Sequence, residues 1–337
     1  MDPFLTDLWL RGLSAVPMLD EASISLVRTE VRDVGRSLTL PDEVIESMAI
    51  VASELGHNQL RHAKSGRVAV RGITRGDSAG IEVVAADRGP GIADPVAALS
   101  DRPSPGPSLG AGIAAVRRLA HEVDFDVRLG DGTCVWARGF SEPPERRREV
   151  AVMGRAAVGE TVCGDAAAFV RHGTEVVFVV ADGLGHGPHA QDAALVVART
   201  LLDSVDGDPR AILADSHVAL SGARGAAATV GRLDEAGGLE LAGVGNVAVR
   251  VEGRSSSRTF IGAAHVLGAA GARRSPAEER LDVGPREVVV AYTDGLSTRT
   301  SLSEDPDLLR EPPLIVAKWL LDRFGKNHDD AMVLVIR

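Results

Sequence analysis

One short stretch, Thr174 to Gly187, constrains the fold of this chain more than any other. Its first half, Glu175 to Ala181, is a Val-rich apolar run, which is typical of a strand buried on both faces. The run ends in Asp182-Gly183, where a carboxylate leaves the strand and a residue without a side chain lets a ligand approach the backbone carbonyl. Carboxylate and carbonyl oxygens on a rigid support suit a hard divalent cation. On this stretch alone, an Asp-Gly turn that closes a hairpin is an equally good interpretation.

Three further acidic residues stand at the edges of predicted strands in the second half of the chain. Asp165 precedes a strand, Asp294 follows one, and Asp329 precedes the last one. If such carboxylates converge to about 4 Å, each pair repels by roughly 4 kcal/mol at an effective dielectric constant near 20. A bound dication removes that cost, so convergence would indicate a metal site with two ions about 4 Å apart that share Asp182.

The second half as a whole alternates between strand and helix patterns. Strands are predicted at about 150–158, 166–170, 176–181, 226–233, 239–243, 247–251, 286–292 and 331–336, and helices at about 189–204, 209–220 and 313–324. Strand runs that are separated by a pair of helices fit a layered α/β sandwich rather than a doubly wound sheet.

The first half contains a long amphipathic helix, predicted from about Asp42 to Ala63 and preceded by a helix from Asp20 to Leu38. Glu54 and Asn58 lie four positions apart in the long helix, so they share one face. An ordinary solvated face fits this spacing, and so does a base with a metal ligand beside a pocket. Residues 1 to about 20 have no assignable pattern.

Glycines follow the acidic end of a strand in this half too. The predicted strands at 67–73 and 81–86 lead into Asp87, Gly89 and Gly91. After a loop rich in Pro and Ser, Gly110 and Gly112 open a short amphipathic helix, where free backbone N–H groups favour an anion. Strands at 123–128 and 133–138 complete the half, and Thr133 begins the second of them.

Composition narrows the classes of partner. The net charge of −10 argues against a nucleic-acid-binding protein and against an anionic membrane surface. Two cysteines far apart in the sequence make no disulfide framework, which indicates a reducing compartment. No signal peptide or membrane-spanning stretch is recognisable, so the cytoplasm is the expected location.

The order of motifs in the first half resembles the GHKL ATPase family, and within it the bacterial serine-kinase branch of anti-sigma factors and RsbT-like switch kinases. The matching words are V-A-S-E-L-G-H-N-Q-L-R-H-A (51–63), A-D-R-G-P-G-I (86–92), S-L-G-A-G-I (108–113) and G-D-G-T (130–133). The resemblance implies a two-layer α/β sandwich over residues 1–140 that binds ATP and Mg²⁺. It also implies that Asn58 holds Mg²⁺, that Glu54 orients or deprotonates the attacking hydroxyl, and that Asp87, supported by Thr133, accepts from the adenine amino group. Backbone at Gly89, Gly91, Gly110 and Gly112 would meet the nucleotide.

The second half resembles the PPM-type metal-dependent serine/threonine phosphatases, with the SpoIIE/RsbX branch nearest. The matching words are G-E-T-V-C-G-D (159–165), V-A-D-G-L-G-H-G (180–187), Y-T-D-G-L (292–296) and H-D-D-A-M-V-L-V (328–335). The resemblance implies a four-layer α-β-β-α sandwich over residues 150–337. Pro143-Pro144 and the charged residues around them indicate a linker between the two halves at 141–149. Asp182 would bridge two Mn²⁺ or Mg²⁺ ions. The Gly183 carbonyl, Asp294 and Asp329 would complete the ligands, and Asp165 would act mostly through water. No arginine matches the phosphate anchor of that branch.

Together the two resemblances imply a bifunctional bacterial switch. The first half would phosphorylate a serine or threonine of a STAS-domain antagonist protein, and the second half would remove that phosphate. A sigma factor or a stressosome-like complex is a further expected partner. Binding to nucleic acid or to a membrane is not expected. The formation of a homodimer is left open. Two alternatives remain: a binding module that sequesters its partner beside an active phosphatase, and a scaffold that uses nucleotide only for folding.

Overall fold

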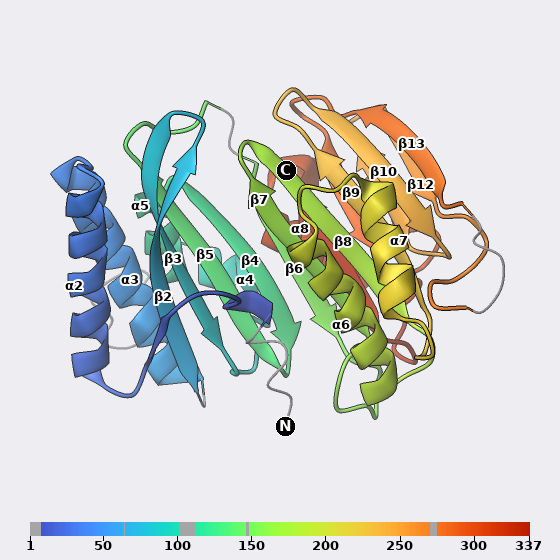
Figure 1. The fold of residues 1–337 in the computed structure, drawn as a ribbon, viewed down its shortest axis with the longest axis horizontal. Helices are drawn as coiled ribbons and strands as arrows, with labels where there is room; N and C mark the ends of the chain where they lie inside the picture. The colour runs from blue at the N-terminus through green and yellow to red at the C-terminus, as the bar shows by residue number, and fades with distance from the viewer. Residues whose placement is uncertain (1–7, 64, 101–111, 146–147, 270–274) are drawn as a thin grey trace. The chain divides into compact units, whose positions relative to one another are not determined.

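The computed structural model describes residues 8–63, 65–100, 112–145, 148–269 and 275–337. The chain divides into two compact units, Met1–Glu149 and Val150–Arg337 (Figure 1). Each unit has its own strands and helices.

Unit 1 is an antiparallel sheet covered by helices on one face. Its elements are β1 (Ala15–Pro17), α2 (Glu21–Ser37), α3 (Asp42–His62), β2 (Gly66–Arg75), β3 (Ser78–Asp87), α4 (Pro95–Leu99), α5 (Ile113–Leu119), β4 (Glu122–Leu129) and β5 (Gly132–Phe140). The strands lie in the order β1-β2-β3-β5-β4, and all neighbours are antiparallel. Helices α2 and α3 contact each other and the sheet (Figure 1). The predicted two-layer α/β sandwich is therefore confirmed.

Local sequence explains why α2 begins and faces the sheet as it does. Asp20 is its N-cap, and the Asp20 carboxylate accepts a hydrogen bond from the Ser23 N–H at 2.9 Å. Ile24, Val27 and Val31 recur at helical spacing and are buried. The apolar stripe therefore packs on the sheet, while Glu21, Arg28, Asp33 and Arg36 of α2 are exposed and Glu30 and Arg32 are half-buried.

The hairpin between β2 and β3 is tighter than the turn-rich sequence Arg75 to Gly80 predicts. Arg75 pairs with Ser78, so the ladder continues to the ends of both strands and leaves only Gly76 and Asp77 in the turn. Gly76 adopts a φ of 56°, which glycine takes without strain. Backbone pairing across the hairpin overrides the turn tendency of Ser78 and Gly80.

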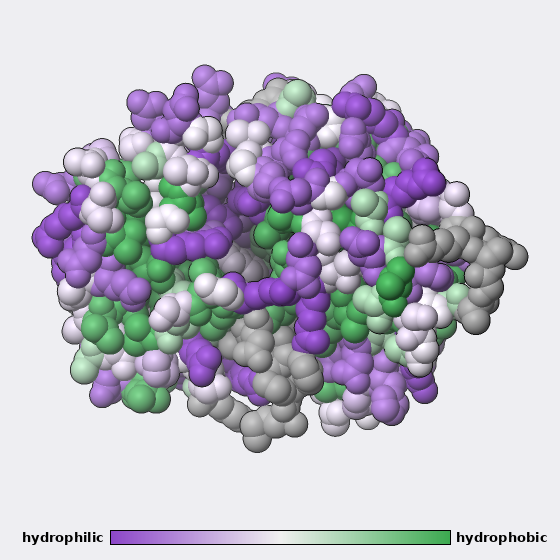
Figure 2. Space-filling model, viewed as in Figure 1, coloured by the Kyte–Doolittle hydropathy of each residue, from purple (hydrophilic) through white to green (hydrophobic). Residues whose placement is uncertain are grey.

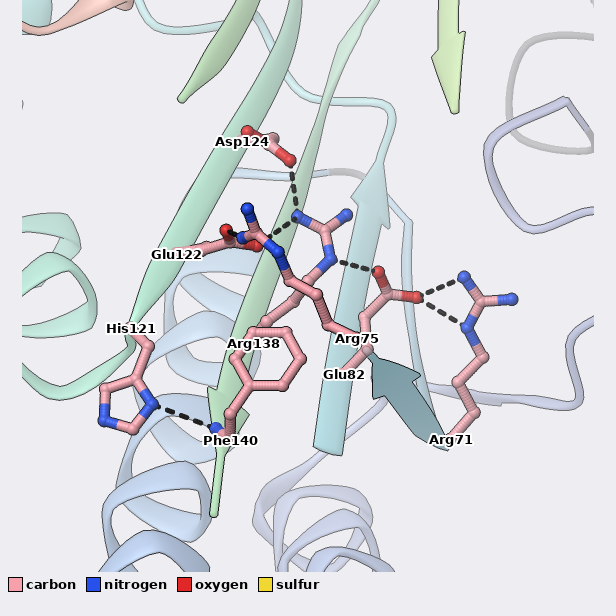
Figure 3. Close-up of polar contacts among 8 residues, drawn as sticks. All are labelled: Arg71, Arg75, Glu82, His121, Glu122, Asp124, Arg138 and Phe140. Atoms are coloured by element: carbon pink, nitrogen blue, oxygen red, sulfur yellow. Dashed lines mark hydrogen bonds and ion pairs between the residues drawn. The ribbon is translucent and has the colours of Figure 1, made fainter. Parts of the chain in front are cut away.

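The sheet face opposite α3 carries a network of charged side chains (Figure 3). Glu82 and Arg138 are ladder partners, and their neighbours Ile81 and Gly139 face the helices, so the alternation of strands directs the charges to the other face. Arg138 donates hydrogen bonds to Glu82 on β3, at 2.7 Å, and to Asp124 on β4. Burial lowers the pKa of Arg138, but the negative charges of Glu82 and Asp124 outweigh it and raise the pKa overall. These buried charges are matched rather than isolated.

Unit 2 consists of two stacked sheets with helices outside both. Its elements are β6 (Val150–Arg155), β7 (Asp165–His172), β8 (Glu175–Gly183), α6 (Pro188–Asp203), α7 (Pro209–Ala219), β9 (Ala226–Leu233), β10 (Gly238–Val244), β11 (Ala248–Glu252), β12 (Ser257–Ile261), β13 (Ala277–Asp282), β14 (Val288–Tyr292), the 3₁₀ helix η1 (Pro306–Arg310), α8 (Pro313–Phe324) and β15 (Ala331–Ile336). One sheet has the order β6-β15-β14-β11-β12, and the other has the order β13-β10-β9-β8-β7. Helices α6 and α7 contact the second sheet, and α8 contacts β6 and β15 of the first. The predicted α-β-β-α layering is confirmed.

The core of unit 2 agrees with the pattern of its central strand. Residues Val176 to Ala181 of β8 are each at most 1% exposed, as the continuous apolar run predicts. The edge strands β12 and β13 are not predicted, because most of their residues are exposed and give no apolar alternation.

No helix among the described residues is long and apolar enough to cross a membrane.

Candidate functional site

Five aspartates gather at the ends of four strands in unit 2. We call them the aspartate cluster: Asp165, Asp182, Asp294, Asp329 and Asp330. Asp165 is the first residue of β7 and lies opposite Asp182 on β8. Asp294 follows β14, and Asp329 and Asp330 precede β15, which pairs with β14. The two sheets thus bring together carboxylates that are far apart in sequence.

Hydrogen bonds from three uncharged groups hold the cluster. The Thr293 hydroxyl donates to Asp165 Oδ2 at 2.7 Å and accepts from the Met332 N–H at 3.0 Å. The Ala157 N–H donates to Asp330 Oδ1 at 2.8 Å, and Asn246 Nδ2 donates to Asp294 Oδ2 at 2.7 Å. Sequence reasoning missed Thr293 and Asn246. Thr293 could have been noticed because it precedes Asp294, whereas Asn246 lies 48 positions away from Asp294.

The electrostatics of the cluster are unfavourable for ionised carboxylates. Burial, followed by the charges of Asp294 and Asp329, raises the pKa of Asp182 to about 7. Burial and then the charge of Asp182 raise the pKa of Asp165 well above its ordinary value, although the Thr293 hydrogen bond lowers it. Like charges that are buried together favour the protonated form. A cation among them would relieve the same repulsion.

The chemistry of these donors fits a hard divalent cation. All are oxygen ligands, and Asp330 Oδ2 is buried without a hydrogen-bond partner among the described residues. A Cβ on Gly183 would lie 2.0 Å from the Ala190 carbonyl oxygen, so only glycine fits beside Asp182. Within the described ranges, no three His, Cys, Asp or Glu side chains are arranged as a ready-made metal site. The predicted ligands Asp165, Asp182, Gly183, Asp294 and Asp329 therefore stay a prediction.

Two residues outside that predicted set lie against the cluster. Asp330, which sequence reasoning did not include, is 2% exposed and contributes to the raised pKa values of Asp165 and Asp182. His186 Nδ1 lies 3.7 Å from Asp330 Oδ2 and 3.9 Å from Asp329 Oδ1. The loop after β8 thus reaches over the same carboxylates.

In unit 1, the residues predicted to bind nucleotide lie on α3, β3 and β5. Glu54 and Asn58 are half-buried and one turn apart on α3. Asp87 ends β3 directly opposite Thr133 on β5. Asp87 Oδ1 accepts the Gly89 N–H at 2.7 Å. Burial raises the pKa of Asp87 to about 6, and the hydrogen bonds from Gly89 and Thr133 oppose that rise.

Glycines shape the backbone around Asp87. Gly91 has a φ of 78°, and a Cβ there would lie 3.0 Å from the Arg128 carbonyl oxygen. A Cβ on Gly132, which sequence reasoning did not single out, would lie 2.1 Å from the Asp87 carbonyl oxygen. Gly112 immediately precedes α5, and Gly110 lies outside the described residues. The nucleotide roles of all these residues stay predictions.

A family model and one curated relative match the first unit. Residues 18–138 match the family model of the histidine kinase-like ATPase domain. The serine/threonine-protein kinase RsbT of Bacillus subtilis (strain 168) is 29% identical over 124 residues, which are 37% of this chain and 93% of RsbT. The predicted GHKL-type domain with an RsbT-like sequence is confirmed.

Solved structures resemble a larger part of the chain. One solved structure is 26% identical to this chain with a TM-score of 0.53. It is described as "The bacterial stressosome: a modular system that has been adapted to control secondary messenger signaling". It covers 57% of this chain and 100% of its own. RsbX in complex with magnesium is 20% identical with a TM-score of 0.51, and covers 58% of this chain and 96% of its own. Unit 1 contains 149 of the 337 residues, which is less than half of the chain. Each of these two structures covers more than half of the chain, so each match includes residues of unit 2. The predicted fusion with an RsbX-like fold is confirmed.

Proposed function

We propose, from the premise that this chain joins a histidine kinase-like ATPase domain to a unit with the fold of RsbX, that it is a bifunctional protein switch. Unit 1 is a serine/threonine kinase that uses Mg²⁺-ATP, and unit 2 is a metal-dependent phosphatase that reverses the modification. The substrate is a STAS-domain antagonist protein. The observation that carries the proposal is the presence, in one chain, of an RsbT-like sequence and of a partly buried aspartate cluster suited to divalent cations.

In unit 1, different residues of α3 and β3 bind the nucleotide, hold the metal ion and accept the proton during phosphoryl transfer. Asp87 accepts a hydrogen bond from the amino group of adenine, and Asn58 is the ligand for the Mg²⁺ that accompanies the ATP phosphates. Glu54 accepts the proton of the serine or threonine hydroxyl as that oxygen bonds to the γ-phosphorus. The bond from phosphorus to the β,γ-bridging oxygen breaks, and ADP leaves. Glu54 and Asn58 can share this task because they lie one turn apart on one helix face.

In unit 2, the aspartate cluster holds the metal ions and thereby sets the reaction. Asp182 is influenced by the charges of Asp294, Asp329 and Asp330 and itself raises the pKa of Asp165, so it would suit a ligand shared by two ions. Dications held by these carboxylates would supply Lewis acidity to an attacking water and positive charge for the phosphoryl group. The bond from phosphorus to the serine oxygen breaks, and inorganic phosphate and the free hydroxyl are the products. The Thr293 hydroxyl orients the carboxylate of Asp165 toward metal binding through its 2.7 Å hydrogen bond to Asp165 Oδ2.

One pair of variants tests both activities on the same substrate. The full chain is incubated with Mg²⁺-ATP, Mn²⁺ and a STAS-domain protein, and phosphorylated STAS protein is quantified by intact-mass spectrometry. Phosphorylated product should accumulate with Asp182→Asn and should be absent with Glu54→Gln. Equal phosphorylation with both variants would reject the division of activities between the units.

A second function, sequestration of the STAS protein by unit 1 without phosphoryl transfer, gives a different result. In that case Asp182→Asn would form a stable complex with the STAS protein, detectable by size-exclusion chromatography, but no phosphorylated product. The half-buried Glu54 on α3 favours turnover, because a pure binding module has no need of a carboxylate at that position.

A further inference from the structure

Asn246, in the loop between β10 and β11, makes direct contact with the aspartate cluster. Its Nδ2 donates to Asp294 Oδ2 at 2.7 Å. Asn246 is exposed, so packing of its side chain does not force the carboxamide into this position. An exposed amide can bond to water equally well, and a lasting contact with one carboxylate therefore needs a backbone that holds the amide in place.

Hydrogen bonds on both sides of Asn246 hold that backbone. The Gly245 N–H donates to the Ala263 carbonyl at 2.7 Å. The Thr229 hydroxyl donates to the Val247 carbonyl at 2.9 Å, and Val247 is fully buried. Asn246 thus lies between two anchored residues, and its Cα has little freedom to move away from the cluster.

The same loop lies against the strand that neighbours Asp182. Gly245 has a φ of 80°, and a Cβ at this position would lie 2.3 Å from the Ala227 Cβ, so glycine is needed for this close approach. Ala227 is the ladder partner of Asp182. The loop therefore carries Asn246 to the strand ends at which the carboxylates gather.

The main chain at Asp294 is held by groups other than Asn246. Lys326 Nζ donates to the Asp294 carbonyl, and a Cβ on Gly295 would lie 1.7 Å from the Asp330 carbonyl oxygen. These contacts act on the backbone, whereas the hydrogen bond from Asn246 acts on the carboxyl group itself. The two kinds of contact together set both the place and the orientation of the Asp294 carboxylate.

An amide donor suits the Asp294 carboxylate better than a positively charged donor would. Burial raises the pKa of Asp182 most, and the charge of Asp294 and a hydrogen bond with its side chain raise that pKa further, so these two carboxyl groups adjoin. Lysine or arginine in place of Asn246 would neutralise Asp294 and compete with a dication. The neutral amide orients the carboxylate and leaves its negative charge available.

We propose that Asn246 is a positioning residue, which holds the Asp294 carboxylate in the orientation that binds a divalent cation together with Asp182. This inference rests on the proposed phosphatase function of unit 2. Hydrogen bonds to ligating carboxylates typically change metal affinity by about 10- to 100-fold. Asn246 therefore sets how tightly the cation is held, and it does so through Asp294.

The test compares Asn246→Leu and Asn246→Ala with Asn327→Leu in the full chain. Leucine has nearly the shape of asparagine but no donor. Asn327 is an exposed asparagine before β15, and its carbonyl rather than its side chain accepts the Val158 N–H at 3.0 Å. Isothermal titration calorimetry gives the dissociation constant for Mg²⁺, and scanning calorimetry gives the melting temperature without metal. The kcat and KM for a phosphoserine peptide are measured over a series of Mg²⁺ concentrations.

Both Asn246 variants should bind Mg²⁺ about 10- to 100-fold more weakly than the wild type. Their melting temperature without metal should not change, because the lost donor is exposed and water replaces it, and Asn327→Leu should match the wild type throughout. The kcat of the Asn246 variants should fall at low Mg²⁺ and recover at high Mg²⁺, while KM for the peptide changes little.

A double-mutant cycle with Asp294→Ala identifies the route of the effect. In the Asp294→Ala background, Asn246→Leu should cause little further loss of Mg²⁺ affinity, because no carboxylate remains for the amide to orient. Wild-type Mg²⁺ affinity in both Asn246 variants, an undiminished further loss in the Asp294→Ala background, or a kcat that high Mg²⁺ does not restore would overturn the inference. A wild type that shows these Mg²⁺ effects but hydrolyses no phosphoester would reject the proposed phosphatase and leave the role of Asn246 supported.

Discussion

Asp165 and Asp182 face each other across the β7–β8 ladder, and burial together with neighbouring negative charge raises the pKa of both carboxyl groups. Antiparallel pairing leaves these two side chains no route away from each other, because Asp165 is 6% exposed and held by Thr293. The arrangement costs stability unless something positive or a proton intervenes.

Divalent cations should stabilise the native protein through Asp182. Mg²⁺ or Mn²⁺ at a hundredfold excess over its dissociation constant should add about 2.7 kcal/mol to the free energy of unfolding, seen as a higher melting temperature in calorimetry. Asp182→Asn should lose most of that increase. Asp206→Asn is the control, because Asp206 is an exposed carboxylate that pairs with His172. An equal cation effect in the wild type and in Asp182→Asn would contradict the metal assignment.

Thr293 should matter through its hydroxyl rather than its shape. Thr293→Val keeps the volume but leaves Asp165 Oδ2 and the Met332 N–H without this partner. Removing one partner of a buried hydrogen bond to a charged group should lower the free energy of unfolding by about 1–3 kcal/mol. Urea unfolding measures the change. Thr293→Ser retains the hydroxyl and should lose less, so equal losses in the two variants would assign the effect to packing.

Glu54 should act on the hydroxyl of the substrate and not on ATP. Glu54→Gln should reduce the rate of STAS-protein phosphorylation by roughly 10²- to 10⁴-fold, the range for a general base. The affinity for Mg²⁺-ATP, measured by calorimetry, should change little. Glu46→Gln on the same helix is a matched control, since exposed Glu46 pairs with Arg32 and lies two turns from Glu54. A rate that survives Glu54→Gln would remove this residue from catalysis.

Asp87 should make the stability of unit 1 depend on pH. Its pKa is about 6 in the folded protein and 3.8 ordinarily, so between these values the native state holds a proton that the unfolded state has released. The contribution of Asp87 is therefore most favourable near pH 4, falls as the pH rises to about 6, and stays low above that. Urea unfolding of the wild type should follow this trend.

The matching variant for this pH effect is Asp87→Asn, which keeps an oxygen to accept the Gly89 N–H. It should be more stable than the wild type at pH 7.5, by roughly 2–3 kcal/mol at most for a shift of this size. The difference should vanish near pH 4. A constant difference across the range would show that ionisation of Asp87 is not its source.

Arg138 should be the most sensitive member of the charged network on the sheet of unit 1 (Figure 3). Arg138→Met leaves the buried carboxylates Glu82 and Asp124 without their central partner, which should cost about 3–5 kcal/mol in urea unfolding. Arg71→Met is the control. Arg71 also donates to Glu82 at 2.6 Å but is half exposed, so its loss should cost no more than about 1 kcal/mol. Similar costs for both would mean that burial does not set the energy of this network.

Particular elements show how far the sequence predicts the fold. The helix Pro313–Phe324 and the strands Ala226–Leu233 and Ala331–Ile336 agree with the predicted bounds, since each has a clear apolar period and distinct breakers at its ends. β13 was missed because Ala277–Asp282 is mostly exposed at the edge of a sheet. β1, with three residues, is too short to show any period.

The sequence by itself determined which residues end the buried strands, and hence that Asp87, Asp165, Asp182 and Asp294 stand at strand termini. That information is local, because burial, period and breakers are properties of adjacent residues. Only the tertiary structure decided which termini meet. Asn246 reaches Asp294, Thr293 reaches Asp165, and Arg224 lies on Gly185, since ladder pairing and sheet stacking join segments that no local pattern links. The local sequence therefore places each aspartate at the end of a strand, and the pairing of strands brings these residues together in one site.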